Sequence, residues 1–344
     1  MMNSMVRHFS VLCFLAVAGC AADSETSSGK QTGAEGETAG TAVTLALNWY
    51  AEAEHGGYFA AQELGFLKDA GLNVQIRQGG PGAPTVVIQE LAAGRIAFAV
   101  SSADMVVLAR AKGVPVVAVA APLQHSPRCI MVHESSGIVS LQDLKDVELA
   151  ISDSRPFALW MKKQLPLTNV TMVPYAGQVG EFVLKQNFAQ QGYVFSEPFI
   201  ARENGSDPKV LMVSDIGFDP YSSLLVTTES MIRDQPDLVT SMVQASVQGW
   251  DAYLSDPEQT NQAIHRENDD MSLSALAYGV DAMRPLCQPD EGVPLCGMTL
   301  ERWTTLVQQI EELGETDPGA VTPAECFTTA FLPPAGEAPN PNSR

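Results

Sequence analysis

Apolar and polar positions between residues 43 and 121 alternate in a way that predicts strands and helices in turn. Four short runs rich in Val, Ile, Leu and Ala are typical of buried strands: VTLALNW (43–49), LNVQIRQ (72–78), IAFAVSS (96–102) and VPVVAVAA (114–121). The segments between them have helical spacing: GGYFAAQELGFLKDAG (56–71), APTVVIQELAAGR (83–95) and ADMVVLARAKG (103–113). This alternation favours an α/β fold with a largely parallel sheet.

A second series with the same alternation follows. Its predicted strands are CIMVHE (129–134), VELAISD (147–153), VTMVPYA (170–176), GYVFSEPF (192–199), KVLMVSD (209–215) and SSLLVTTE (222–229), with helices at 157–164 and around 180–190. Beyond residue 230 the pattern is helical, with two apolar stripes that we expect to face the core: Val239, Val243, Val247, Trp250 and Leu254, then Leu300, Trp303, Leu306, Ile310 and Leu313.

The N-terminus has the pattern of a bacterial lipoprotein signal. Arg7 and His8 precede an apolar run that is shorter than the roughly 20 residues a membrane span needs. The run ends in small residues before Cys20, whose thiol can accept a lipid. We therefore expect a signal peptide at 1–19 and a lipid anchor at Cys20, facing the periplasm or cell exterior. An ordinary secretory peptide with an incidental Cys20 is the alternative.

The charge composition of the chain disfavours two classes of binding partner. The chain of 344 residues has 40 acidic and 20 basic residues, a net charge of -20 and no Lys/Arg cluster, which disfavours nucleic acid and anionic lipid surfaces. The membrane should be contacted only through the N-terminal lipid. Gly, Ser, Thr and Glu dominate 20–41 and predict a flexible linker, and the Pro-rich segment 333–344 predicts a disordered tail.

Six cysteines are present, of which Cys129, Cys287, Cys296 and Cys326 lie beyond the signal and the lipid site. In an oxidising compartment these are disulfide candidates, and Cys287 with Cys296 could close the loop CQPDEGVPLC; a bond between Cys129 and Cys326 stays open. A metal site is the weaker interpretation, because no short Cys-x-x-Cys spacing or nearby His occurs. We expect no metal and no cofactor.

Three segments carry a family resemblance: LNWYAEAEHGGYFAAQELGFLKDAGLNV (47–74), LAAGRIAFAVSSADMVVLARAKGVPVVAVAAPLQHSPRCIMVHESSGI (91–138) and GYVFSEP (192–198). The chain resembles the substrate-binding proteins of ABC importers, in the branch that binds thiamine pyrimidine precursors, and related sulfonate and nitrate receptors. The resemblance covers most of 43–330. It implies a periplasmic binding protein type II fold, with 42–135 and 220–332 in one lobe, 136–219 in the other, a two-crossing hinge, a permease partner and a monomeric state.

Ligands of open α/β sheets sit outside the carboxyl ends of strands, and the loops there hold our candidate site residues. Asn48 offers an amide, and Trp49 or Tyr50 offers a face on which a heteroaromatic ring can stack. Related receptors also place a His at the position of His55, so contact with the ligand competes with a structural role at the helix start.

Ser101 and Ser102 precede a helix, where backbone N–H groups favour an anion or a carbonyl oxygen; N-capping by Ser102 or Asp104 is the alternative. Gln124 and His125 resemble a family element that lines the hinge or touches the ligand.

The second lobe contributes the loop of Tyr175 and Gly177, and Glu197 after YVFS. A carboxylate can accept two parallel N–H bonds from an aminopyrimidine edge, so we rank Glu197 first. Capping of the following helix is the alternative.

These residues predict a receptor for a small heteroaromatic solute, a thiamine pyrimidine precursor such as an aminomethyl- or hydroxymethylpyrimidine. Riboflavin would need a larger apolar cleft, and a sulfonate or nitrate would need positive charge, which Arg155 could supply. The fungal pyrimidine synthase shares the implied fold but carries a dense cysteine motif where this chain reads GYVFSEPF. No Gly-x-Ser-x-Gly or His-Glu-x-x-His pattern is present, and we expect no enzyme activity.

Overall fold

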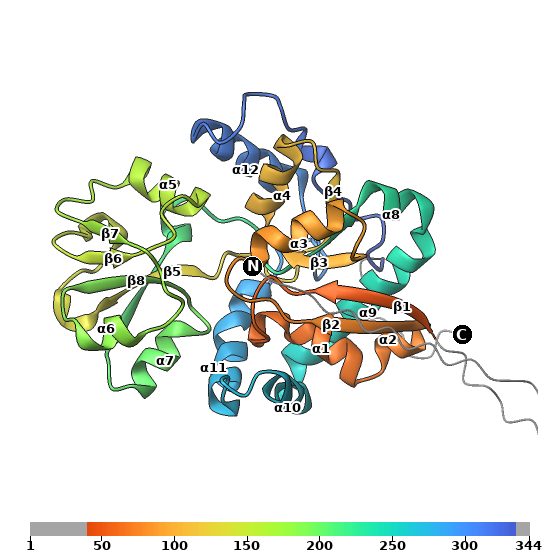
Figure 1. The fold of residues 1–344 in the computed structure, drawn as a ribbon, viewed down its shortest axis with the longest axis horizontal. Helices are drawn as coiled ribbons and strands as arrows, with labels where there is room; N and C mark the ends of the chain where they lie inside the picture. The colour runs from red at the N-terminus through yellow and green to blue at the C-terminus, as the bar shows by residue number, and fades with distance from the viewer. Residues whose placement is uncertain (1–39, 335–344) are drawn as a thin grey trace, which may run out of the picture. The chain divides into compact units, whose positions relative to one another are not determined.

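The computed structural model describes residues 40–334, which form two five-stranded sheets joined by two chain crossings (Figure 1). The predicted signal peptide and Cys20, nearly all of the predicted linker, and the predicted tail from residue 335 lie outside the described residues. Among the described helices, none is long and apolar enough to cross a membrane.

The first sheet has the strand order β2-β1-β3-β10-β4. Its strands are β1 (Thr41–Ala46), β2 (Leu72–Arg77), β3 (Phe98–Ser101), β4 (Val116–Ala120) and β10 (Leu224–Thr228). Strand β1 runs parallel to β2 and β3, whereas β10 is antiparallel to β3 and β4.

The second sheet has the strand order β7-β6-β8-β5-β9. Its strands are β5 (Arg128–His133), β6 (Glu148–Ala150), β7 (Thr171–Val173), β8 (Phe188–Tyr193) and β9 (Pro208–Met212). Strand β6 is parallel to β7 and β8, and β5 is antiparallel to β8 and β9.

Helices follow most strands, as the alternating pattern predicts. The α-helices are α1 (Gly56–Glu63), α2 (Phe66–Asp69), α3 (Ala83–Ala92), α4 (Ala103–Ala111), α5 (Pro156–Gln164), α6 (Gly180–Leu184), α7 (Glu197–Glu203), α8 (Glu229–Asp234), α9 (Pro236–Ser255), α10 (Glu258–Glu267), α11 (Leu273–Met283) and α12 (Leu300–Glu312). The 3₁₀ turns are η1 (Ala53–His55), η2 (Glu134–Ser136), η3 (Leu141–Asp143), η4 (Val213–Ile216), η5 (Arg284–Cys287) and η6 (Pro323–Glu325).

The α/β architecture is confirmed, but each sheet has one strand that is antiparallel to both its neighbours. These strands, β5 and β10, follow the segments 121–127 and 217–223, in which the chain passes from one sheet to the other. A strand that enters from the other sheet has no helical crossover to keep it parallel to the preceding strand. Strand β5 pairs in the second sheet, although the predicted first lobe extends to residue 135. The lobe boundaries and the hinge stay predictions.

Three predicted elements differ in the structure. The helix expected at 56–71 is two helices, because Gly65 has a φ of 85° and ends the helical path. The helix expected around 180–190 ends at Leu184, and residues 188–190 already belong to β8. The strand expected from GYVFSEPF ends at Tyr193, because Glu197 and Pro198 begin α7.

A close helix contact fixes the start of α1, just after the loop that follows β1. A Cβ atom on Gly57 would lie 2.2 Å from the indole of Trp250, and one on Gly56 would lie 1.9 Å from the ring of Tyr253. Only glycine therefore allows α1 to approach the apolar stripe of α9, on which Val239, Val243, Val247 and Trp250 are buried as predicted. On α12 the stripe is buried at Trp303, Leu306 and Ile310, but Leu300 is exposed.

No disulfide is formed among the four candidate cysteines, all of which are free and buried. The thiol of Cys129 donates to the Gly192 carbonyl in the second sheet, at 3.4 Å. The Cys326 carbonyl instead accepts from the N–H of Ala118 in the first sheet. Cys287 and Cys296 share an apolar core cluster but are not bonded.

Candidate functional site

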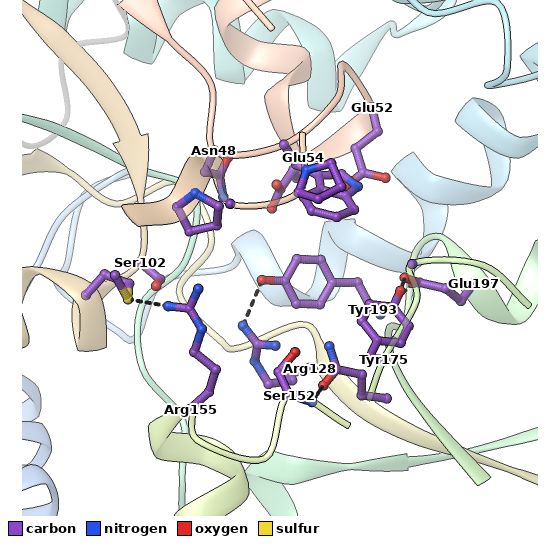
Figure 2. Close-up of a pocket in the computed structure, with 18 of the residues that line it drawn as sticks. Asn48, Glu52, Glu54, Ser102, Arg128, Ser152, Arg155, Tyr175, Tyr193 and Glu197 are labelled. Carbon is purple, nitrogen blue, oxygen red and sulfur yellow. Dashed lines mark hydrogen bonds between the residues drawn. The ribbon is translucent and has the colours of Figure 1, made fainter. Parts of the chain in front are cut away.

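A cavity of about 280 Å³ opens between loops of the two sheets (Figure 2). The first sheet supplies the loops after β1, β2 and β3, and the second supplies the ends of β6, β7 and β8 together with β5 and the start of α7. The cavity therefore lies outside the carboxyl ends of parallel strands, where ligands of such sheets bind.

Seven of the predicted site residues line this cavity: Asn48, Trp49, Ser101, Ser102, Tyr175, Gly177 and Glu197. Their contact with a ligand stays a prediction. Trp49 lies close to the β7–α6 loop, since a Cβ atom on Gly177 would be 3.7 Å from its indole. Tyr50 packs against Trp49 at an angle of 72° but is 46% exposed, and of the two aromatic residues only Trp49 lines the cavity.

The other three predicted residues, His55, Gln124 and His125, do not line the cavity. His55 is fully buried behind it, and burial lowers its pKa to about 3, so the imidazole is neutral. Its Nδ1 accepts from the N–H of Glu52 and its Nε2 lies 2.9 Å from Oδ1 of Asn48, which orients that amide. His55 thus supports the site from behind.

Gln124 and His125 lie in the first crossing segment. The Gln124 amide donates to the carbonyl groups of Ala121 and Gly297, and it is buried. Nδ1 of His125 lies 2.7 Å from Oδ2 of Asp219, which belongs to the second crossing. Both residues therefore organise the passage between the sheets, which is the hinge-lining alternative of the sequence analysis.

Three buried carboxyl groups define one part of the cavity: Glu52, Glu54 and Glu197. Burial raises the pKa of Glu54 to about 7, and burial together with the charges of Glu54 and Glu197 raises the pKa of Glu52. Burial also raises the pKa of Glu197. Removal of carboxylates from water favours their protonated forms, and a ligand that brings positive charge or N–H donors would favour the ionised forms instead.

Glu54 and Glu197 differ in how their oxygens are occupied. Oε1 of Glu54 is buried and accepts no hydrogen bond, and it lies 3.3 Å from Nε2 of the neutral His55 ring. Oε1 of Glu197 accepts from the hydroxyl of Tyr175 at 2.5 Å, and Oε2 accepts from the N–H of Tyr193 at 2.7 Å. A buried oxygen without a donor is costly, so Glu54 is prepared to accept a donor from a ligand.

Two arginines of the second sheet's side, Arg128 and Arg155, also line the cavity. The Arg128 guanidinium lies 4.2 Å from the centre of the Phe157 ring and donates to the Tyr193 hydroxyl at 3.1 Å. Nη1 of Arg155 contacts Sδ of Met105 at 2.9 Å. Within residues 40–334, no carboxylate lies within 4.0 Å of either guanidinium.

The loop after β3 adds hydroxyl groups. Oγ of Ser101 is buried without a hydrogen-bond partner. The Ser102 hydroxyl donates to Oδ1 of Asp104, at 2.5 Å, and does not cap the backbone of α4. The alternative of N-capping by the Ser102 side chain is therefore absent, and the hydroxyl donates to a carboxylate of the cavity wall instead.

Sequence reasoning missed Glu52, Glu54, Arg128 and Tyr193 as cavity residues. The pair of glutamates two residues apart before Gly56 was visible in the sequence, but polar residues in a loop are usually solvated. Their burial depends on α11, which packs against η1 and is more than 200 residues away in the chain. Among the described residues, no group of His, Cys, Asp and Glu is arranged to hold a metal ion.

The architecture is that of the periplasmic binding proteins. It superposes on the periplasmic aliphatic sulphonate binding protein SsuA of Escherichia coli with a TM-score of 0.64 and 16% sequence identity. The superposition covers 83% of this chain and 91% of the other. Residues 52–260 match the sequence model of the NMT1/THI5-like family, and the chain belongs to that family.

Three relatives are similar over much of their length. The formylaminopyrimidine-binding protein of Halalkalibacterium halodurans is 22% identical over 78% of this chain and 84% of the relative. The riboflavin-binding protein RibY of Chloroflexus aurantiacus is 25% identical over 75% and 77%. The 4-amino-5-hydroxymethyl-2-methylpyrimidine phosphate synthase THI11 of Saccharomyces cerevisiae is 23% identical over 62% and 68%.

Proposed function

We propose that this protein is the lipid-anchored solute-binding component of an ABC importer and that it captures a thiamine pyrimidine precursor of the aminomethyl- or hydroxymethylpyrimidine type. The observation that carries the proposal is the unpartnered Oε1 of Glu54, buried beside two further carboxyl groups in a cavity that Trp49 flanks. A relative named for formylaminopyrimidine binding supports the same ligand class.

An aminopyrimidine fits this chemistry in two ways. Its flat ring can stack on the indole of Trp49, which contributes about 1 kcal/mol beyond the area buried. Its exocyclic amine and a protonated ring nitrogen present two parallel N–H donors, which a carboxylate accepts as a bidentate, charge-assisted pair. The positive ring would also offset the mutual repulsion of Glu52, Glu54 and Glu197.

Glu54 is the better candidate for this bidentate role, although the sequence analysis ranks Glu197 first. Both oxygens of Glu197 already accept hydrogen bonds from the second sheet's side, from Tyr175 and Tyr193. We assign Glu197 to holding the Tyr175 ring in the cavity wall and to adding negative charge.

The alternatives fit less well. A flavin is a large ligand, and pockets for drug-sized molecules have volumes of about 300–1,000 Å³, whereas this cavity measures about 280 Å³. Sulfonate or nitrate would meet four cavity carboxyl groups, those of Glu52, Glu54, Asp104 and Glu197. A synthase role has a relative in its favour, but no Lys, Cys or His stands among the described cavity-lining residues. We therefore propose a binding protein without catalytic activity.

A thermal-shift panel with the full chain tests the ligand class. Ligand at about 100 times its Kd should add roughly 2.7 kcal/mol to the free energy of unfolding. We expect a raised midpoint with aminomethyl- and hydroxymethylpyrimidine and none with riboflavin, taurine or nitrate. A shift with riboflavin or an anion alone would replace the proposed ligand, and formation of a pyrimidine phosphate by the protein would overturn the binding role.

The anchor and the importer have separate tests. Replacement Cys20→Ala should move the protein from the membrane fraction to the soluble periplasmic or secreted fraction, and should leave pyrimidine binding unchanged. An unchanged membrane fraction would contradict lipidation.

Deletion of the gene for this protein should abolish uptake of labelled hydroxymethylpyrimidine by the cell at low external concentration. Undiminished uptake would contradict the importer role.

A further inference from the structure

Arg155 has no anionic partner in the cavity wall. It occupies the position before the first residue of α5, and its guanidinium Nη1 reaches across to the thioether of Met105, in α4 on the other side of the cavity. A thioether is a weak acceptor, so it leaves most of the five guanidinium donors unused. In the part of the chain that the structure describes, no carboxylate lies within 4.0 Å of this side chain.

A second unused polar group lies at the end of β3, directly before α4, the helix that holds Met105. Oγ of Ser101 is buried, lines the cavity and makes no hydrogen bond. Its neighbour Ser102 also lines the cavity, but the Ser102 hydroxyl already donates to Asp104. A buried hydroxyl can donate to an acceptor, and its present lack of a partner costs free energy that a ligand oxygen would recover.

The charges of the cavity are separated in space. Figure 2 places Arg155 and Ser102 at one side and Glu52 and Glu197 at the other, with the Tyr193 ring between them. One end therefore presents the carboxyl groups of Glu52 and Glu197, whereas the other presents the Arg155 guanidinium together with the Asp104 carboxylate that the Ser102 hydroxyl holds. A ligand that satisfies both ends has donors or positive charge at one end and an acceptor with negative charge at the other.

We propose that Arg155 and Ser101 form a second subsite that binds a carboxylate substituent of the ligand. The proposal deepens the proposed function, since it makes the preferred solute an aminopyrimidine that carries a carboxylate in place of the hydroxymethyl group. An Arg fork matches a carboxylate in a bidentate geometry. Asp104 also lines this region, and its charge disfavours a dianionic phosphate there more strongly than a carboxylate with a single charge.

A charge series on one ring tests the subsite. The ligands are 4-amino-5-hydroxymethyl-2-methylpyrimidine and two analogues in which a carboxylate or an aminomethyl group replaces the hydroxymethyl group. Nicotinate and nicotinamide form a second pair that differs in the same way without the aminopyrimidine. Affinities are measured by calorimetry for the full chain, for Arg155→Gln and for the control Lys163→Gln. Lys163 also lies on α5 but pairs with Glu312 outside the cavity.

We expect the unsubstituted protein to bind the carboxylate analogue about tenfold more tightly than the hydroxymethyl compound, and the aminomethyl analogue more weakly than either. In Arg155→Gln the carboxylate analogue should lose its higher affinity, whereas Lys163→Gln should keep the same ranking of affinities as the unsubstituted protein. Equal affinities across the series, or the same order in Arg155→Gln, would overturn the subsite.

The two proposals fail in different ways. If no aminopyrimidine binds but nicotinate binds more tightly than nicotinamide, and only when Arg155 is present, the pyrimidine function is wrong and the subsite holds. If the neutral pyrimidine binds and the carboxylate gives no gain, the subsite is wrong and the function holds. If neither pair binds, both are wrong.

Discussion

The hydroxyl of Tyr175 donates a hydrogen bond of 2.5 Å to Oε1 of Glu197, which joins the β7–α6 loop to the first turn of α7 at the cavity wall. The other carboxylate oxygen accepts from the N–H of Tyr193. Gly192 makes room for this arrangement, because a Cβ atom there would lie 3.1 Å from Cβ and Oε2 of Glu197. Glu197 therefore ties three segments of the second sheet together.

Substitution of Glu197 separates its structural role from its charge. In Glu197→Gln the amide oxygen can accept from the Tyr193 N–H while its NH₂ donates to the Tyr175 hydroxyl, so we expect the free energy of unfolding to change by less than about 1 kcal/mol. Glu197→Ala leaves those donors unsatisfied and should cost about 1–3 kcal/mol. Urea denaturation measures both values. Equal losses in the two variants would show that the hydrogen bonds do not matter.

The stability of the empty protein should depend on pH through Glu54. Its folded-state pKa of about 7 is above the ordinary value of 4.5, so between these values the folded chain binds more protons than the unfolded chain. The contribution of Glu54 protonation to the free energy of unfolding is fully present below pH 4.5 and is lost as pH rises to about 7. It amounts to at most about 3 kcal/mol.

Glu54→Gln should flatten this dependence, because the amide does not titrate. Denaturation midpoints at pH 5 and pH 7.5 test the prediction, with Glu134→Gln as a control whose side chain is 66% exposed. The burial that raises the pKa values of Glu52 and Glu197 acts with the same sign, so part of the slope should remain. An identical slope in Glu54→Gln and in the control would refute the assignment.

The His125–Asp219 contact predicts a pH-dependent link between the two crossings. The hydrogen bond with Asp219 raises the pKa of His125, so the contribution to stability is present below the ordinary value of 6.5 and is lost as pH rises above the folded-state pKa. The His125 side chain is 41% exposed, which limits the effect to about 1 kcal/mol or less. The unfolding midpoint of His125→Gln should therefore be lower than that of the unsubstituted protein at pH 6 and close to it at pH 8.5. A constant difference would indicate packing alone.

Gly57→Ala should destabilise the fold by about 1–3 kcal/mol, since overpacking of a tight contact forces helices apart. The new methyl group would lie 2.2 Å from the Trp250 indole, and α1 starts directly after the loop that holds Glu54. Gly65→Ala is the informative comparison: nothing lies within 4 Å of its Cβ position, and its cost is limited to the strain of φ 85°. Thermal unfolding of both variants checks this. A smaller loss in Gly57→Ala than in Gly65→Ala would contradict the packing argument.

The sequence predicts the fold well where apolar runs are short and glycines or prolines bound them, as for β1, β3 and β4. It fails at β8, where FAQQGY is buried although it holds two glutamines, Gln190 and Gln191, which do not read as a buried strand. The sequence pattern also predicts where β5 and β10 fall along the chain but not that they are antiparallel to their neighbours, because their orientation follows from the crossings between the sheets.

The site was predictable to the extent that it follows from strand ends. Ser101 ends β3, Trp49 and Glu197 lie in or just after the loops that follow β1 and β8, and all three line the cavity. Glu54 was not predictable, because its burial arises from η1 packing against α11 and from the cover of the second sheet's loops. The sequence places His55 at the site, but His55 lies behind the residues that line the cavity. Nothing in the local sequence distinguishes a residue that contacts the ligand from one that orients Asn48.

The most direct measurement is a calorimetric titration of the full chain with 4-amino-5-hydroxymethyl-2-methylpyrimidine, repeated for Glu54→Gln and Glu134→Gln. We predict one binding site in the unsubstituted protein, a loss of about tenfold or more in Glu54→Gln, where a charge-assisted pair becomes a neutral one, and unchanged affinity in Glu134→Gln. Absence of binding to the unsubstituted protein, or equal affinity in Glu54→Gln, would contradict the account.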